Sequence, residues 1–543
     1  MKRMALCMLM SFAVPGAAPA QSPGTPPGVT THFSQGWPTR LMDNAATLGT
    51  GTIRDSLHWA AIETVPGQYS FTDRNSGHVA RACAAGMTVL LGIDPRNKLY
   101  DNGKTAYSPQ ARAAFANYLL TIADRYPGCV IGIEVGNEIN GRNNVTGLAA
   151  TDRAASHTAL LRAIHDRVKP AHPDLKIIGG STNTIATGFL AKLFEAGALA
   201  YMDGVAVHPY RNDPEAVDWE LGRLRAAMTR AGQVRPIWAT EFSRDFAASA
   251  DAAPFYLKMT SLMQGAGVTD HYWYALIDQK WFPTMGLLTL AGEQKPAARA
   301  YAFAAANLAP LGPAQRIDHG DPALFHFRYG ADAHVIWGGR RTLAVTGTPR
   351  FHRADGSPVA QPTMVSDDPI VIFGATGVSF GPPQVLADSL YGFAQAPLSW
   401  YARRDLTGLR IPLGPVDWQW TTYLGSAAVP RMIVNTAGIG PTNKTSAVVR
   451  YSADLAVPLV ASVCLSPMGT TGDGTTASIV HNGTTLWSEQ VGPLTGKRNA
   501  QAPITVRVGD TVEFILSPNA TPAGDRMKYR FRITRGATDA PDC

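Results

Sequence analysis

The sequence lacks the features that mark several common protein classes. Its five cysteines include no C-x-x-C pair, so a zinc site or a dithiol redox centre has little support. Only 16% of the residues are charged and the basic ones form no run, which argues against a nucleic-acid partner. Beyond the leader, no apolar stretch reaches the roughly 20 residues of a membrane span. Internal repeats and low-complexity tracts are also absent, so we expect a globular protein of several domains.

The first twenty residues have the organisation of a secretory signal. Lys2 and Arg3 precede an apolar run, and Ala18-Pro19-Ala20 supplies small residues at a cleavage site. We expect cleavage after Ala20 and a mature protein that is secreted or periplasmic. Cleavage removes two of the 48 basic residues and none of the 41 acidic ones, which leaves a mild positive excess.

Four cysteines remain after the leader, an even number that suits an exported chain. Cys83 lies on a predicted helix and Cys129 opens a predicted strand, both towards the same end of the fold. Cys464 and Cys543 are the only cysteines of the last predicted domain. We therefore predict the disulfides Cys83–Cys129 and Cys464–Cys543.

From residue 29 to about residue 309, short apolar runs alternate with Ala-rich amphipathic segments. The amphipathic segments, such as 109–125 and 152–169, are typical of helices that bury one face. The apolar runs have the length and continuous apolar character of parallel strands buried on both faces. They are 29–33, 51–57, 87–93, 129–135, 175–180, 202–208, 235–241 and 269–275. Eight strand–helix units over roughly 280 residues predict an α/β fold, a closed (β/α)8 TIM barrel.

The rest of the chain predicts β structure. Short alternating segments separated by Gly, Pro and Asp turns follow residue 311, and a Pro/Gly stretch at 380–384 precedes longer strand-like runs. We expect a signal peptide (1–20), a catalytic barrel (21–310), a small all-β domain (311–384) and a β-sandwich (385–543). The sandwich is rich in aromatic residues, so it either binds carbohydrate or braces the barrel.

Two carboxylates follow predicted strands at the positions where a barrel enzyme carries its chemistry. Glu138 follows the fourth strand and Glu241 ends the seventh. The carboxyl ends of all eight strands meet at one mouth of the barrel, so both side chains should project there. Each alone suits a solvated loop, but the pair matches glycosidic bond hydrolysis. In that reaction one carboxyl group protonates the leaving oxygen and the other attacks the sugar carbon.

Several passages resemble clan A glycoside hydrolases, the retaining barrel enzymes. The resemblance rests on VGNEIN (135–140), ATEF (239–242), TIRDSLHWAAIETVPGQYSF (52–71), VAVHPY (205–210) and MGLLTLAGEQKPAARAYAF (285–303). Within the clan, the likeness is greatest to glycoside hydrolase family 39 and its relatives that cut bacterial exopolysaccharides. It covers residues 29 to 310 and the small β domain. The sequence departs from it at Gly136 and in lacking Pro after Glu138, where relatives often read W-N-E-P.

The resemblance implies that Glu138 is the general acid/base and Glu241 the nucleophile. The residue types around them fit these roles. Arg54 near Glu241 would keep that carboxylate ionised, and Tyr210 can donate a hydrogen bond to it. Asn137 can hold a substrate 2-hydroxyl, an interaction that strengthens in the transition state.

Further residues are predicted to line the substrate site. His208 ends the sixth strand, where it is either a site residue or a packed spacer. Trp59, Trp273 and Trp281 lie in segments assigned to the catalytic face, and aromatic faces stack on sugar rings. Trp273 is the best candidate because it lies on the last barrel strand. No cofactor or metal is implied.

These features predict a secreted retaining β-glycosidase that cuts an extracellular polysaccharide internally. Aromatic residues spread over several loops suit a groove with many subsites. Arg96, Lys98, Arg142 and Lys280 are placed at the mouth, where they would attract an acidic polymer. Two alternatives stay open, an exo-acting β-xylosidase-like enzyme and a non-catalytic carbohydrate-binding protein on a decayed barrel. The partner is a polysaccharide or oligosaccharide, and the sequence does not indicate an oligomeric state.

Overall fold

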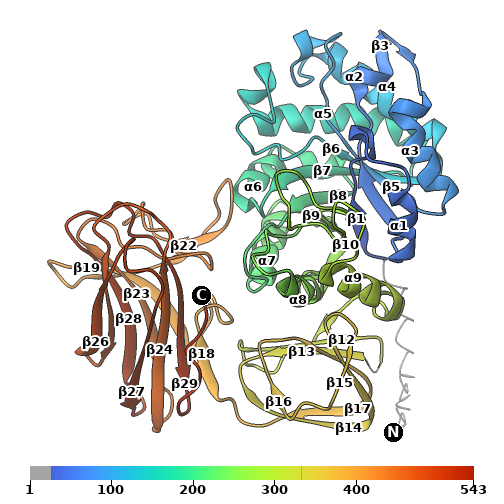
Figure 1. The fold of residues 1–543 in the computed structure, drawn as a ribbon. Helices are drawn as coiled ribbons and strands as arrows, with labels where there is room; N and C mark the ends of the chain where they lie inside the picture. Colours follow the sequence, from blue (N-terminus) through green and yellow to red (C-terminus); the bar gives the residue numbers. More distant parts are fainter. Residues whose placement is uncertain (1–25, 332) are drawn as a thin grey trace, which may run out of the picture.

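The computed structural model describes residues 26–331 and 333–543 (Figure 1). The leader predicted for residues 1–20 lies outside this range. Within the described residues, no helix combines the length and apolarity that crossing a bilayer would require.

The first half of the chain forms a closed barrel of eight parallel strands, as predicted. Its strands are paired in the order β1-β10-β9-β8-β7-β6-β5-β2. Their bounds are β1 Gly28–Thr30, β2 Thr52–Asp55, β5 Thr88–Ile93, β6 Val130–Val135, β7 Lys176–Asn183, β8 Gly204–His208, β9 Ile237–Phe242 and β10 Val268–Trp273. A short hairpin, β3 (Glu63–Val65) and β4 (Gln68–Tyr69), follows the second barrel strand. Seven of the barrel strands begin and end within two residues of a predicted apolar run or extend it at the carboxyl end, and β1 ends three residues before its predicted run does.

Helices cover the outside of the barrel (Figure 1). They are α1 Leu41–Thr47, α2 Trp59–Ile62, α3 Asp73–Ala84, α4 Pro109–Arg125, α5 Arg153–Val168, α6 Thr187–Glu195, α7 Val217–Arg230, α8 Ala252–Gly265 and α9 Pro296–Asn307. Local chemistry sets where they begin. The Ser108 hydroxyl accepts a hydrogen bond from the amide of Ala111 and Pro109 occupies the first helical position, so α4 begins there. The Asp152 carboxylate caps α5 in the same way.

The barrel interior is layered, and the layers position the site. The lower layer is apolar and consists of Leu90, Ile178, Ala206, Trp238 and Tyr272. Alternate residues of a strand point to the same face, so the inward residues two positions further along form the next layer. That layer is polar and leads up to the mouth. The barrel therefore buries charged groups directly beneath the site.

Two β regions follow the barrel. The first is a seven-stranded sheet next to α8 and α9, with strands β11 Gln315–Arg316, β12 Leu324–Tyr329, β13 Ala333–Gly338, β14 Arg341–Arg353, β15 Pro358–Val359, β16 Met364–Val365 and β17 Ile370–Phe380. The second packs two sheets around a shared apolar core. One sheet is β18 Val385–Asp388, β29 Met527–Thr534, β24 Pro458–Pro467 and β27 Arg498–Thr505. The other is β20 Arg410–Pro412, β19 Leu398–Arg404, β23 Thr445–Ser452, β28 Thr511–Pro518, β25 Thr475–His481 and β26 Thr484–Val491.

A pair of short strands extends from this sandwich towards the barrel. The strands are β21 (Gly414–Val416) and β22 (Tyr423–Gly425), and they pair antiparallel. In Figure 1 the loops around β22 reach from the sandwich to the side of the barrel that carries α6. The two parts of the chain therefore meet at the rim of the barrel.

Both predicted disulfides are present. Cys83 and Cys129 are joined between α3 and the start of β6. Cys464 on β24 is joined to Cys543, which ties the end of the chain to the sandwich.

Replacing Cys464 and Cys543 by serine should lower the free energy of unfolding of the sandwich by about 2–4 kcal/mol, because the bridge restricts the unfolded chain. Scanning calorimetry should show a lower transition temperature for the sandwich and an unchanged one for the barrel. The matched control, Cys83→Ser with Cys129→Ser, should lower the barrel transition instead. An unchanged thermogram for the first variant would show that the bridge contributes nothing.

Candidate active site

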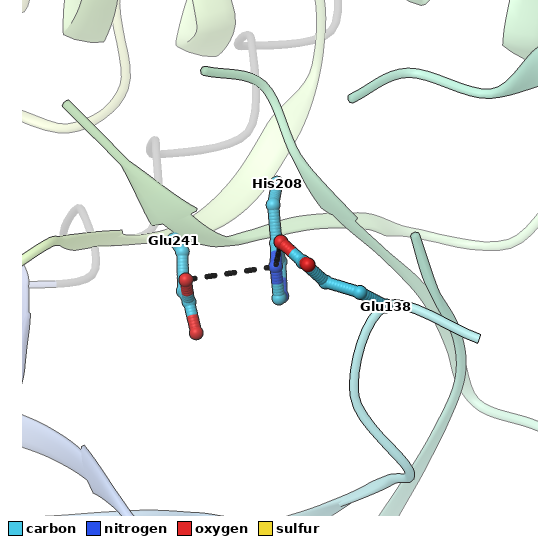
Figure 2. Close-up of side chains that lie close together, drawn as sticks. All are labelled: Glu138, His208 and Glu241. Carbon is cyan, nitrogen blue, oxygen red and sulfur yellow. Dashed lines mark hydrogen bonds and ion pairs between the residues drawn. The ribbon is translucent and has the colours of Figure 1, made fainter. Parts of the chain in front are cut away.

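Glu138 and Glu241 lie side by side at the mouth of the barrel (Figure 2). Glu241 belongs to the end of β9, and Glu138 follows β6. One oxygen of each carboxyl group lies within 4.8 Å of the other. This spacing agrees with the roughly 5–5.5 Å of retaining glycosidases and is too short for a separation near 9 Å, which would leave room for an attacking water.

Glu241 is held as an anion by three neighbours. Arg54 Nη1 donates to its Oε1 at 2.5 Å and the Tyr210 hydroxyl donates to its Oε2 at 2.6 Å. His208 Nδ1 lies 3.6 Å from Oε2. Burial alone would raise the pKa of the Glu241 carboxyl, but His208, Arg54 and Tyr210 together lower it below its ordinary value. An ionised carboxylate at this position is available as a nucleophile.

Glu138 is more exposed and is held differently. Its side chain is 24% exposed, against 10% for Glu241. Asn183 Nδ2 donates to its Oε1 at 2.8 Å, and His208 Nδ1 lies 3.3 Å from the same oxygen. Its backbone has a φ of 46°, a conformation that side-chain-bearing residues rarely adopt. Arg54 does not contact it, so Glu138 has the more solvated and less cationic surroundings of the two carboxyl groups.

Gly136 is required by this backbone path. Its φ is 81°, and a Cβ there would lie 2.9 Å from Ile139 Cγ2. The sequence therefore departs from the W-N-E-P pattern at a position where the chain turns in the left-handed region.

The sequence analysis missed Glu134, a fully buried carboxylate directly beneath the pair. Arg54 Nε donates to Glu134 Oε2 at 2.6 Å. Its Oε1 receives the Ser181 and Thr240 hydroxyls at 2.6 and 2.9 Å and lies 3.2 Å from His208 Nε2. Although burial would raise the pKa of Glu134, Arg54 and His208 hold it well below its ordinary value. A buried charge with this many partners is rare away from functional sites.

His208 carries a positive charge in this network. Burial would lower the pKa of its imidazole, but Glu241, Glu134 and Glu138 raise it to about 9. Two cations, Arg54 and His208, thus face two anions, Glu134 and Glu241, so the charges of these four buried groups balance. His208 is the packed member beneath the site rather than part of the cleft wall, since its side chain is 0% exposed.

Three of the predicted aromatic site residues do not line the cleft. For Trp59 and Trp273, which are buried, the prediction is wrong. Trp59 is buried, stacks on Tyr100 and donates its indole N–H to Glu63. Trp273 is buried among the aromatic residues of the outer helices, with its indole N–H on the carbonyl of Met285. Trp281 is 78% exposed and does not line the cleft.

The cause is strand alternation at the end of β10. Tyr272 faces the barrel interior, so Tyr274 also points inward and Trp273 points outward. Tyr274 lines the cleft, and Phe282 does so in place of Trp281. Predicted Arg54, Asn137 and Tyr210 do line it, and Arg54 Nη2 donates to Asn137 Oδ1 at 3.1 Å.

The mouth opens into a cleft of about 910 Å³. Its lining includes three arginines and seven carboxyl groups, namely Arg54, Arg211, Arg244, Asp55, Asp94, Glu138, Asp213, Glu220, Glu241 and Asp245. The four cations assigned to the mouth from the sequence are not among the lining residues, and Arg96 is paired with Asp94. The prediction that these four cations attract an acidic polymer to the mouth is therefore wrong in its premise. They do not line the cleft, and carboxyl groups outnumber arginines among the residues that do.

Glu138, His208 and Glu241 also have the atom types and spacing of a metal site. The positive charges of Arg54 and His208 oppose the binding of a metal ion there. The Arg54 guanidinium already occupies Glu241, and the raised pKa of His208 makes it an imidazolium with no free lone pair. The arrangement suits proton transfer and nucleophilic attack better than cation binding.

Comparison with known proteins agrees with this site. Residues 106–301, which include both carboxylates, match a family model described as glycosyl hydrolase catalytic core. A family 39 glycoside hydrolase from Bacteroides cellulosilyticus WH2 superposes with a TM-score of 0.53 at 17% identity, covering 65% of this chain and 81% of that one. A family 39 β-xylosidase from Caulobacter crescentus gives 0.45 at 18% identity, covering 65% and 97%. The family 39 enzyme from Xanthomonas axonopodis pv. citri gives 0.45 at 13%, covering 92% and 96%. The search of curated proteins found no match.

The barrel with its paired carboxylates is therefore a glycoside hydrolase domain. The chain carries a glycosyl hydrolase catalytic core. The predicted resemblance to glycoside hydrolases is confirmed by the match over residues 106–301, and the likeness to the family 39 structure confirms the barrel fold.

The raised pKa of His208 predicts a pH-dependent stability. Its contribution is fully present below the ordinary histidine pKa of about 6.5 and is lost as the pH rises through about 9, amounting to at most about 3 kcal/mol. The melting temperature of the wild-type protein should fall across this interval more steeply than that of His208→Asn. Parallel pH profiles of the two proteins would show that His208 is neutral in the folded state.

Proposed function

We propose that the protein is a retaining β-glycosidase that works by double displacement, with Glu241 as nucleophile and Glu138 as general acid/base. The observation that carries this proposal is the short distance between the two carboxyl groups, together with the pairing of Arg54 and Tyr210 with Glu241 and not with Glu138. That pairing divides the roles, since the carboxylate held by a guanidinium attacks and the other holds a proton.

In the first step, Glu241 attacks the anomeric carbon of the sugar while Glu138 donates its proton to the departing oxygen. The bond from the anomeric carbon to that oxygen breaks and an ester to Glu241 forms. Asn137, fixed by Arg54, is placed to hold the 2-hydroxyl. Formation of the ester also removes the negative charge of Glu241. Glu138 is then the one anion of the pair, which suits its role as a base in the second step.

In the second step, Glu138 acts as a base. It takes a proton from a water molecule, whose oxygen attacks the anomeric carbon and displaces Glu241. Both carboxyl groups return to their starting states and the anomeric configuration is kept. Tyr210 and Arg54 receive the carboxylate as it is released.

The substrate we propose is an extracellular polysaccharide or oligosaccharide that is cut internally. The cleft volume of about 910 Å³ is near the upper end of the roughly 300–1,000 Å³ of sites that enclose a drug-sized ligand, which favours a site that holds more than one sugar. The predicted leader and the two disulfides support a place outside the cytoplasm. The likeness to family 39 supports membership of that family.

The roles of the two carboxyl groups can be separated by chemical rescue. Glu138→Ala should lose at least about 100-fold in kcat for poor leaving groups, because general acid catalysis is worth about 10²–10⁴-fold. It should keep activity on a 2,4-dinitrophenyl glycoside, whose leaving group needs no proton, and azide should yield the β-azide. Without azide, Glu241→Ala should be inactive on every substrate. With azide, it should convert the dinitrophenyl glycoside to the α-azide. The opposite pattern would exchange the two roles.

Internal cutting is tested by size-exclusion analysis of a polymer digest. The mean chain length should fall early, before monosaccharide accumulates, because internal bonds are cut at random. Release of monosaccharide from the start, while the polymer stays long, would establish the exo-acting β-xylosidase-like alternative instead. Proton NMR of the first product should show the β-anomer.

A further inference from the structure

The catalytic cleft is lined partly by the C-terminal sandwich. Thr421 and the turn residues Asn435, Thr436 and Ala437 line the same cavity as Glu138 and Glu241. These residues are some 180 to 300 positions away from the two carboxylates in the sequence. We call residues 417–422 the docking segment and residues 435–438 the cleft turn.

The docking segment is bonded to the barrel along its length. The amide of Gly188 donates to the carbonyl of Trp418 at 3.0 Å, and Asn140 Nδ2 donates to the carbonyl of Gln419 at 3.0 Å. The Thr184 hydroxyl donates to the carbonyl of Trp420. Backbone carbonyls of three consecutive residues thus accept hydrogen bonds from the loops after β6 and β7 and from the first turn of α6, which is typical of a well-packed contact.

Charged side chains hold the two ends of the segment. Arg223 on α7 pairs with Asp417 at 2.9 Å, and both are largely buried. The Thr421 hydroxyl donates to Glu220 Oε2 at 3.2 Å, and Glu220 in turn pairs with Arg211 at 2.9 Å. Arg211 and Glu220 themselves line the cleft, so the segment is continuous with the cleft wall.

A glycine makes this close approach possible. Gly188 lies in the first turn of α6, where glycine is a poor helix former. A Cβ at this position would lie 2.4 Å from the carbonyl oxygen of Asp417 and 2.9 Å from the carbonyl carbon of Trp418. These are backbone atoms, so any side chain at residue 188 would push the docking segment away from the barrel.

The segment also reaches the general acid through two amides. Asn140 bonds to Gln419 of the segment and accepts from the amide of Asn183 at 2.9 Å. Asn183 Nδ2 in turn donates to the Glu138 carboxyl group. The docking segment therefore stands over the loops after β6, β7 and β8, on the part of the rim that includes Glu138, and β6 lies across the barrel from β10, which carries Tyr274 at its end.

The cleft turn is rigid and presents small side chains. Asn435 and Gly438 exchange backbone hydrogen bonds, and Arg526 Nη2 donates to Asn435 Oδ1 at 2.7 Å. Thr436 and Ala437 occupy the tip between them. Small residues at the tip leave room for a ligand between the turn and Glu138.

The side of the mouth on which the docking segment lies determines which part of the substrate it contacts. In a retaining hydrolase the nucleophile and the general acid lie on opposite sides of the scissile bond. The leaving-group sugar therefore lies on the general-acid side of the anomeric carbon, away from the nucleophile. We propose that the docking segment and the cleft turn form the leaving-group wall of the cleft, which contacts the sugar released in the first step. The proposal rests on the proposed function. It makes the sandwich a part of the active site rather than a separate binding module or a brace.

The first test fills the wall without touching the carboxyl pair. Ala437→Trp should lower kcat/KM by about tenfold or more for a reducing-end-labelled oligosaccharide, because one lost sugar contact is worth about 10–200-fold. The wild-type enzyme is first tested on the 2,4-dinitrophenyl β-glycosides of xylose, glucose, galactose and mannose. The probe is the oligosaccharide of the sugar whose glycoside is cleaved fastest. With that glycoside, which carries no leaving-group sugar, the variant should match the wild type. The control Ala427→Trp, an exposed residue outside the cleft lining, should leave both values unchanged.

The second test moves the wall from a distance. Gly188→Ala displaces the docking segment and should also reduce kcat/KM for the oligosaccharide while sparing the dinitrophenyl glycoside. Its control is Gly222→Ala on α7, where an added Cβ meets nothing within 4 Å. Melting curves check that all four variants fold.

The outcomes separate the two proposals. If the wild-type enzyme cleaves none of the glycosides or oligosaccharides, the proposed function is wrong. If it cleaves them and Ala437→Trp changes both substrates equally or neither, the enzyme stands and the leaving-group wall is wrong. Selective loss on the oligosaccharide with both controls silent establishes the wall.

Discussion

The active site depends on one buried guanidinium that bridges two carboxylates. Arg54 binds Glu134 through Nε and Glu241 through Nη1, and it crosses the barrel from β2 to do so. Removing such a charge from water costs several kcal/mol unless its partners are well placed, and here every donor that faces the interior has one. Gly92 leaves the space for it, since a Cβ there would lie 3.3 Å from Arg54 Nη2. The cluster fixes the Glu241 carboxylate before any substrate binds, which is the kind of preorganisation that catalysis requires.

The same network gives two nearby carboxyl groups different surroundings. Glu241 lies between Arg54, Tyr210 and His208, whereas Glu138 is held by a neutral amide and is more exposed. Glu134 adds a second buried anion, and both anions raise the pKa of His208, which favours its protonated form. The charged layer below the site thus fixes the surroundings of Glu241, although Glu134 itself does not line the cleft.

The barrel and the sandwich meet at the rim, and residues of both line the cleft. Backbone groups of residues 417–422 bond to the loops after β6 and β7, and Gly188 admits them at close range. A contact of this kind links the position of a distant domain to the loops that carry Glu138. It also gives the cleft a wall that the eight strand-end loops do not supply by themselves.

Much of the fold and the centre of the site could be predicted from the sequence, because both depend on local patterns. Apolar runs and amphipathic segments marked the eight strands and their helices, strand counting placed Glu138 and Glu241 at one mouth, and cysteine positions gave both disulfides. Only the tertiary structure decided which aromatic residues face inward, since Trp273 and Tyr274 differ by one step of strand alternation. It alone showed Glu134, which in the sequence is one polar residue in a buried strand, and the sandwich residues of the cleft. Those roles arise from contacts between segments hundreds of residues apart, and no local pattern encodes them.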